Sequence, residues 1–175
     1  MFSPLNTILP VLTTTPARWS ALCETLPADL LRRKPRAGEW SALECLLHLL
    51  DAEKFVFPAR ARAFLAGVDF PNYDPDVQGT RDTGQPPAAL AAEFAALRAA
   101  SLELAAGLSP ADLPRPARHP MLGPVTLEQL LQEWAGHDLM HTVQAEQALM
   151  QPFIAACGPW REFFADHDAA LKKPA

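Results

Sequence analysis

Hydrophobic residues recur every three to four positions along most of this chain, which is the spacing of amphipathic helices. In the stretch "AALAAEFAALRAASLELAAGL", for example, Leu90, Phe94, Leu97 and Leu104 fall on one side of a helix. The alternating runs that are typical of strands are almost absent. The pattern predicts helices over residues 16–26, 41–65, 88–108, 126–149 and 152–168.

Helix boundaries coincide with capping residues and with prolines, of which the chain has 18, about twice the usual share. Pro16 is predicted in the first turn of the first helix, with any earlier helical piece broken at Pro10. Ser41 and Glu44 have the spacing of a capping box, in which each side chain bonds a backbone N–H of the other. Pro58 is expected to kink or split the second helix.

These segments predict an all-α protein, a four-helix bundle with an additional short C-terminal helix. The length suits one domain over residues 1–175, with a core over about 15–150, a closing helix over 152–168 and a tail over 170–175. Residues 67–87 form a long polar connection that contains Gly and Pro. Such a loop is often functional, although a simple connector explains it equally well.

The composition narrows the classes of partner. A net charge of −5 and a pI near 5.5 provide no basic surface for nucleic acid or an anionic membrane. No apolar stretch approaches the ~20 residues that cross a bilayer, and the N-terminus lacks the pattern of a secretory signal. Cys23, Cys45 and Cys157 are odd in number and far apart, unlike a disulfide framework. We therefore expect a soluble, cytoplasmic protein.

The sequence "HDLMH" contains two histidines, His137 and His141, one turn apart in the helix predicted over residues 126–149. His141 falls within the apolar stripe of this helix and His137 at its edge, so both are predicted to face inward. Hydrogen bonds to the core would be one explanation for two buried imidazoles. Their Cβ atoms would also lie about 5–6 Å apart, close enough for both rings to bind one ion.

A third ligand would be needed, because two protein ligands do not make a durable metal site. His48 and Cys45, on the helix that begins at Ser41, are the candidates. Helical periodicity leaves open whether His48 faces the histidine pair, and a single cysteine in a helix is usually a small core residue.

Three stretches of the chain resemble the DinB/YfiT-like superfamily: "RAGEWSALECLLHLLDAE", "LRAASLELAAGLSPADL" and "RHPMLGPVTLEQLLQEWAGHDLMHTVQ". They occur in the order of that family, and the resemblance extends from Thr15 to about Gln147. It implies a DinB-like four-helix-bundle metalloprotein in which His48, His137 and His141 bind one divalent transition metal. Zinc or nickel is the metal to expect, and relatives are often homodimers.

The resemblance leaves the reaction open. Three uncharged imidazoles would leave a coordination position for water or substrate, as in catalytic sites. One hypothesis is the transfer of a low-molecular-weight thiol, such as bacillithiol or mycothiol, to an electrophile. The alternatives are metal-dependent hydrolysis of an amide or ester, and a non-catalytic metal-binding or interaction bundle. The expected partners are a small-molecule substrate or thiol, and a second copy of the chain.

Several polar residues are candidates to assist such a site. Asp138 and Glu133 flank the histidine pair and are candidates to orient an imidazole, although both could equally solvate the helix edge. Asp51 is a possible polar neighbour of the third histidine. Arg81 and Arg98 are candidates to bind a substrate carboxylate, and Arg98 is equally a candidate for a structural ion pair.

Overall fold

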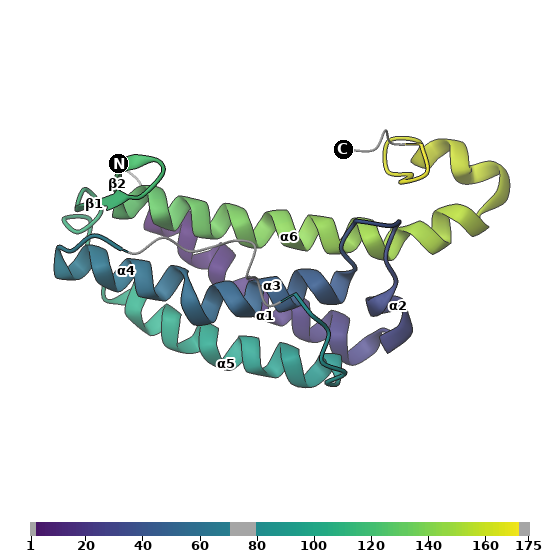
Figure 1. Cartoon of the computed structure of the whole chain (residues 1–175), viewed down its shortest axis with the longest axis horizontal. Helices are drawn as coiled ribbons and strands as arrows, with labels where there is room; N and C mark the ends of the chain where they lie inside the picture. Colours follow the sequence, from purple (N-terminus) through teal and green to yellow (C-terminus); the bar gives the residue numbers. More distant parts are fainter. Residues whose placement is uncertain (1–2, 71–79, 172–175) are drawn as a thin grey trace.

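The computed structural model describes residues 3–70 and 80–171, and its architecture is an all-α four-helix bundle (Figure 1). The long helix α6 runs along one side, α3 and α4 follow each other end to end beneath it, and α5 and α1 complete the bundle. The elements in chain order are α1 (Leu5–Thr25), α2 (Ala28–Arg32), α3 (Ala42–Phe55), α4 (Phe57–Ala66), α5 (Pro87–Ala106), β1 (Pro116–His119), β2 (Gly123–Thr126), α6 (Leu127–Ala156) and the 3-10 helix η2 (Gly158–Phe164).

A layer of buried polar side chains divides the hydrophobic core in two. Helices α1 and α3 each pack against both α5 and α6. One apolar cluster lies around Leu12, Phe57 and Trp134, and the other around Trp19, Leu46 and Phe94. Between these clusters, helices α1, α3, α5 and α6 each contribute buried polar residues. These residues are Thr15, His48, Glu53, Arg98, Ser101, Asp138, His141 and Thr142. The interior of this bundle is therefore polar at mid-height.

The start of α3 and its junction with α4 confirm two predictions. Ser41 caps α3 in a complete capping box: its side chain accepts from the Glu44 N–H, and the Glu44 carboxylate accepts from the Ser41 N–H. The predicted helix over 41–65 is split at Val56, just before Pro58, because a proline has no N–H to donate to the turn before it.

The first helix differs from its prediction. Instead of starting at Pro16, α1 begins at Leu5 and continues through both Pro10 and Pro16. Its apolar stripe, with Ile8 and Leu12 buried ahead of Pro16, is long enough for packing to stabilise the helix across two prolines. The prediction that these prolines mark boundaries was wrong, since tertiary contacts overrode local propensity.

A short hairpin also departs from the expectation that strands are absent. Strands β1 and β2 pair antiparallel, with Pro116 opposite Thr126 and His119 opposite Gly123. Strands of four residues are too short to show an alternating pattern in the sequence. The hairpin leads directly into α6, whose first turn is held by a capping box between Thr126 and Gln129.

The additional short C-terminal helix is present but starts later than residue 152. Helix α6 passes through Pro152 and ends at Ala156, and the 3-10 helix η2 (Gly158–Phe164) follows it among the described residues. Ile154 is buried beyond the proline, and its packing stabilises the last turn. Residues 172–175 of the predicted tail, and 71–79 of the predicted loop, lie outside the described residues. No described helix is long and apolar enough to cross a membrane.

Replacing Pro10 by Ala is expected to stabilise the protein by about 1–2 kcal/mol, because Pro10 is exposed in the interior of α1 and its substitution restores a helical hydrogen bond. Pro16→Ala is the matched control. The Leu12 carbonyl, to which an alanine at position 16 would donate, already accepts a hydrogen bond from Arg98, so a smaller gain is expected. Urea denaturation of both variants measures the difference, and equal gains would contradict this account.

Candidate metal centre

Three histidines from two helices meet within the polar layer. His48 lies on α3, and His137 and His141 lie on successive turns of α6. The ring centroids are 4.9 Å apart for His48 and His137, and 4.5 Å apart for the other two pairs. His48 and His141 are buried and His137 is half-buried. The structure therefore decides the direction of His48, which helical periodicity left open.

The nitrogen atoms of these rings fit a single divalent ion. Two nitrogens at ~2.0–2.1 Å from one ion are about 2.9–3.4 Å apart in octahedral or tetrahedral geometry. The Nε2 atoms of His48 and His137 are 2.9 Å apart, and one ring nitrogen of each histidine lies within 4.8 Å of the others. Small side-chain movements would bring all three to ligand distance.

Hydrogen bonding orients His141. Its Nδ1 lies 2.9 Å from Oε1 of Gln144, one turn further along α6. Because an amide oxygen only accepts, this contact places the proton of a neutral His141 on Nδ1 and leaves Nε2 with a lone pair. Nδ1 of His137 is buried and has no hydrogen-bond partner among the described residues, whereas its Nε2 faces Nε2 of His48.

The surroundings keep two of these imidazoles uncharged. Burial, with smaller contributions from His141, His48 and Arg98, lowers the pKa of His137 to about 3. Burial also lowers the pKa of His141, although Gln144 and Asp138 counteract the shift. Both rings are therefore neutral at physiological pH, and the neutral form is the one that can donate a lone pair to a metal.

Aromatic rings enclose the histidines at both ends. Trp40, just before the cap of α3, stacks on His141 at 5.6 Å and lies 5.1 Å from His48. Phe57, at the start of α4, contacts His137 edge to face at 5.1 Å. These apolar walls exclude water and strengthen electrostatic interactions at the ring nitrogens.

A buried charge network lies beside the histidines. The Arg98 guanidinium, 1% exposed, donates to Oε2 of Glu53 at 2.8 and 3.0 Å and to Asp138 at 2.5 and 3.1 Å. It also donates to the Leu12 carbonyl at 3.2 Å. Burial alone would lower the pKa of Arg98, but Asp138 and Glu53 outweigh burial and raise it. One cation and two carboxylates thus share the interior with the three imidazoles.

Comparison with known proteins identifies the family. The family model of the DinB superfamily matches residues 12–145, well over half of the chain. The chain belongs to the DinB superfamily. All three histidines lie within the matched region. None of the curated proteins compared with the chain matches it.

Two solved structures from Bacillus subtilis share the fold. YfiT, described as a probable metal-dependent hydrolase with an unusual four-helix bundle topology, superposes with a TM-score of 0.70 at 20% sequence identity, covering 82% of this chain and 85% of YfiT. The DinB-like protein YjoA superposes with a TM-score of 0.57 at 22% identity, covering 82% of this chain and 90% of YjoA. At these identities the likeness concerns the fold.

Two of the residues predicted to assist the site, Asp138 and Glu133, have other surroundings in the structure. Asp138 is buried and directs its carboxylate at Arg98, while its effect on His141 is electrostatic. Glu133 is exposed and lines a separate cavity of ≈ 460 Å³ with Arg60 and His119. The exposure of Glu133 supports the alternative prediction, which is solvation of the helix edge.

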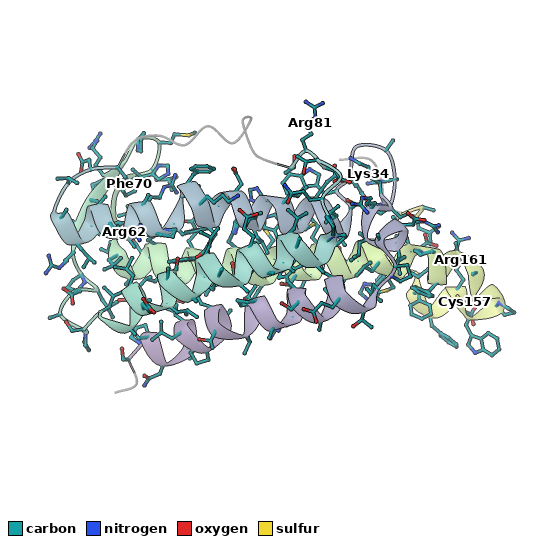
Figure 2. The ribbon with its side chains drawn as sticks, turned by 90° about the horizontal axis from the view of Figure 1, so that it is seen from below. Lys34, Arg62, Phe70, Arg81, Cys157 and Arg161 are labelled. Carbon is teal, nitrogen blue, oxygen red and sulfur yellow. The ribbon has the colours of Figure 1, made fainter. Side chains whose placement is uncertain are left out.

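The remaining predicted residues also lie elsewhere. Asp51 and Arg81 line a cavity of ≈ 330 Å³ between α3 and the start of α5, and the three histidines are not among its lining residues. Figure 2 shows Arg81 pointing outward from the bundle. Arg98 is buried in the core, where it forms ion pairs with Glu53 and Asp138, so the structural ion pair predicted as the alternative to substrate binding is confirmed.

Cys45 does not join the histidines. It is fully buried in the apolar cluster around Leu46. Burial raises its pKa to about 12, so its thiol stays protonated at neutral pH. Cys45 is a core residue of α3.

Sequence reasoning missed three residues that shape the site. Gln144 had a readable signal, because it is three residues after His141 and therefore on the same face of α6. Trp40 and Glu53 had no such signal in the sequence. The position of Trp40 depends on how the segment before α3 folds back, and that of Glu53 depends on its pairing with Arg98, 45 residues away.

Removing the buried cation is expected to destabilise the bundle strongly. Arg98→Met leaves Glu53 and Asp138 buried without their partner, at a cost of about 3–5 kcal/mol in the free energy of unfolding. Arg32→Met is the matched control, since Arg32 pairs with Asp82 at the surface and its loss should cost less than about 1 kcal/mol. Similar losses in both variants, measured by urea denaturation, would contradict the proposed weight of the buried network.

The three cysteines are expected to differ in reactivity. Cys157, on the C-terminal segment at one end of the molecule (Figure 2), is partly exposed. Burial raises the pKa of Cys23 to about 11 and that of Cys45 to about 12. At pH 8 a disulfide reagent should therefore label one thiol per chain in the folded protein and all three after unfolding. Labelling of a second thiol in the native state would contradict the core position of Cys45 or Cys23.

Proposed function

We propose that this protein is a metal-dependent hydrolase whose divalent ion is held by His48, His137 and His141. The observation that carries the proposal is the convergence of three imidazoles, two of them held uncharged, in an enclosed site. Three protein ligands leave a position for water, as in catalytic zinc sites. The description of YfiT as a probable metal-dependent hydrolase supports the same reaction class.

The donor set favours a transition metal, and zinc or nickel is the one that we propose. Imidazole nitrogen is a borderline ligand that suits zinc, copper, iron and nickel, whereas calcium and magnesium require oxygen ligands. Among the described residues, both buried carboxylates near the rings are engaged by Arg98.

The residues of the chain prepare the chemistry in distinct ways. A bound dication lowers the pKa of a water or thiol beside it, and so supplies the nucleophile. Gln144 holds the proton of His141 on Nδ1, and Trp40 and Phe57 shield the rings from bulk water. In hydrolysis the oxygen of water bonds to the acyl carbon, the bond to nitrogen or oxygen breaks, and the departing amine or alcohol takes up the proton.

Thiol transfer is the second candidate, and one feature of the site favours it. Carboxylate oxygens for general-base catalysis are scarce in the polar layer: Asp138 directs both oxygens at Arg98, and Glu53 keeps one, Oε1, without a partner among the described residues. A thiol needs less help than water to ionise, since its ordinary pKa is about 8.5. In this reaction a sulfur–carbon bond forms, the leaving group departs as an anion, and the thiol proton passes to solvent.

Elemental analysis of the natively purified protein is expected to find about one zinc or nickel ion per chain. The double variant His137→Ala/His141→Ala should lose this metal, and His119→Ala, which changes a histidine of the hairpin, should keep it. Metal at a hundredfold excess over Kd should stabilise the native protein by about 2.7 kcal/mol. A metal-free protein whose melting temperature zinc leaves unchanged would overturn the proposal.

The two reactions are separated by a comparison of substrates on the metal-loaded protein. Hydrolysis predicts release of 4-nitrophenol from small acyl esters without any thiol. Thiol transfer predicts turnover of monobromobimane only when a low-molecular-weight thiol is supplied. Activity in neither assay, in a protein with its full metal content, would contradict both reactions and leave a binding role for the ion.

A further inference from the structure

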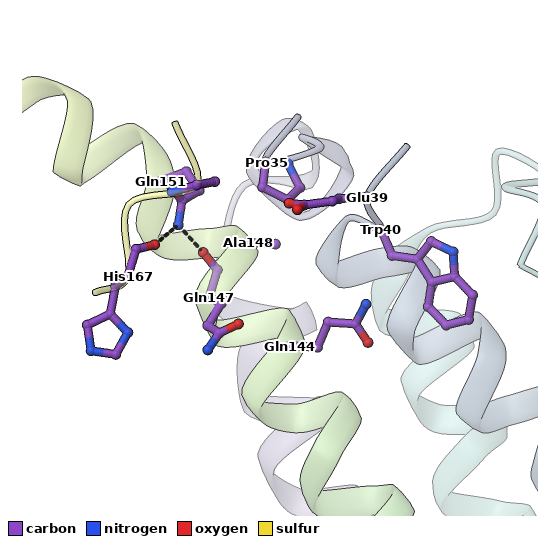
Figure 3. A pocket seen from close by; sticks show the side chains of 9 residues that line it. Pro35, Glu39, Trp40, Gln144, Gln147, Ala148, Gln151 and His167 are labelled. Carbon is purple, nitrogen blue, oxygen red and sulfur yellow. Dashed lines mark hydrogen bonds between the residues drawn. The ribbon is translucent and has the colours of Figure 1, made fainter. Parts of the chain in front are cut away.

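A cavity of ≈ 190 Å³ lies between the segment before α3, the later turns of α6 and the C-terminal segment, and none of the three histidines lines it. Two of its lining residues, Trp40 and Gln144, are the same side chains that stack on His141 and hydrogen bond to it. Figure 3 shows both side chains at one end of this cavity, with Gln147 and Gln151 following along α6. These two side chains thus lie between the cavity and His141.

The lining of the cavity is polar and contains two ionisable side chains, Glu39 and His167. Glu39 is its carboxylate, and one of its oxygens is already paired with Arg36 at 2.7 Å. The amide oxygen of Gln144 accepts the hydrogen bond from His141, which leaves its NH₂ group as a donor. Gln147 adds a second carboxamide to the lining. Carboxamides beside an indole face match another amide, which needs both a donor and an acceptor and stacks on aromatic rings.

The far wall of the cavity belongs to the C-terminal segment, beyond the residues that the family model matches. Gln151 holds this wall in place: its amide donates to the His167 carbonyl at 3.0 Å and accepts from the Ala169 N–H at 2.8 Å. An ion pair of 2.6 Å between Arg161 and Asp168 closes the same turn. One wall of the cavity is therefore formed by the C-terminal segment.

We propose that this cavity is a specificity pocket that binds an uncharged, amide-bearing arm of the substrate next to the reacting group. The inference rests on the proposed metal-dependent function and adds to it the class of substrate. The arm contacts Gln147 and Gln144 and packs on Trp40, while Gln151 keeps the C-terminal wall in position. An acidic arm would meet Glu39, and the lining contains no lysine or arginine to bind it.

Two hydroxamic acids of matched length test the pocket, because a hydroxamate binds a divalent ion and carries its tail into the adjoining space. N-acetylglycine hydroxamic acid has an amide in its tail, and pentanohydroxamic acid has a plain alkyl chain. Calorimetry on the zinc-loaded protein should give an affinity about tenfold higher for the amide-bearing compound. Gln147→Leu should abolish this preference, and Gln132→Leu, an exposed glutamine outside the cavity on the same helix, should retain it.

The outcomes are distinguishable. Equal affinities of the wild-type protein for the two compounds, with zinc bound, would overturn the pocket and leave the metal site intact. A preference that survives Gln147→Leu would also overturn it, since the amide would then be recognised elsewhere. A protein that takes up no zinc would overturn the proposed function together with this inference. Gln151→Leu, which frees the C-terminal wall, should reduce the preference in the same assay.

Discussion

The arrangement of the bundle depends on the hydrogen bonds that the buried guanidinium of Arg98 donates. From α5 it donates hydrogen bonds to Glu53 on α3, Asp138 on α6 and the Leu12 carbonyl on α1. A single buried group therefore joins all four of these helices. The Leu12 carbonyl is available because Pro16, four residues later, has no N–H to donate to it. A proline that is unfavourable for the helix thereby supplies an acceptor for a charge that could not otherwise be buried without cost.

This network also determines where the histidines lie. Asp138 follows His137 directly, so the ion pair with Arg98 sets the rotation of α6 about its axis at the height of the site. Glu53 does the same for α3, five residues after His48. Because a helix turns by about 100° per residue, fixing one side chain fixes its neighbours. Burying these charges costs stability that apolar packing could have supplied, and the polar layer holds the two helices in one register.

The site that results combines enclosure with neutrality. Trp40 and Phe57 cover the imidazoles at the two ends, and burial keeps His137 and His141 in the form that binds metal. The network beside them carries one more negative than positive group, which complements a dication held by uncharged ligands. The C-terminal segment then closes a polar cavity beside Trp40 and Gln144, the two side chains that contact His141, and part of this wall lies outside the family match.

The sequence by itself determined the features that depend on neighbouring residues. The helical periodicity, the capping box at Ser41, the break before Pro58 and the placement of His137 and His141 on one face all follow from spacings of a few positions. Such spacings are set by helix geometry alone. The four-residue strands and the helix through Pro10 and Pro16 escaped prediction, because pairing and packing outweighed local preference there. Spacing left the direction of His48 open, and only the family resemblance implied that it joins the pair. The tertiary structure alone decided that Arg98 is buried between Glu53 and Asp138 and that the C-terminal segment closes a cavity. These contacts join residues far apart in the sequence, and their distances follow from how whole helices pack.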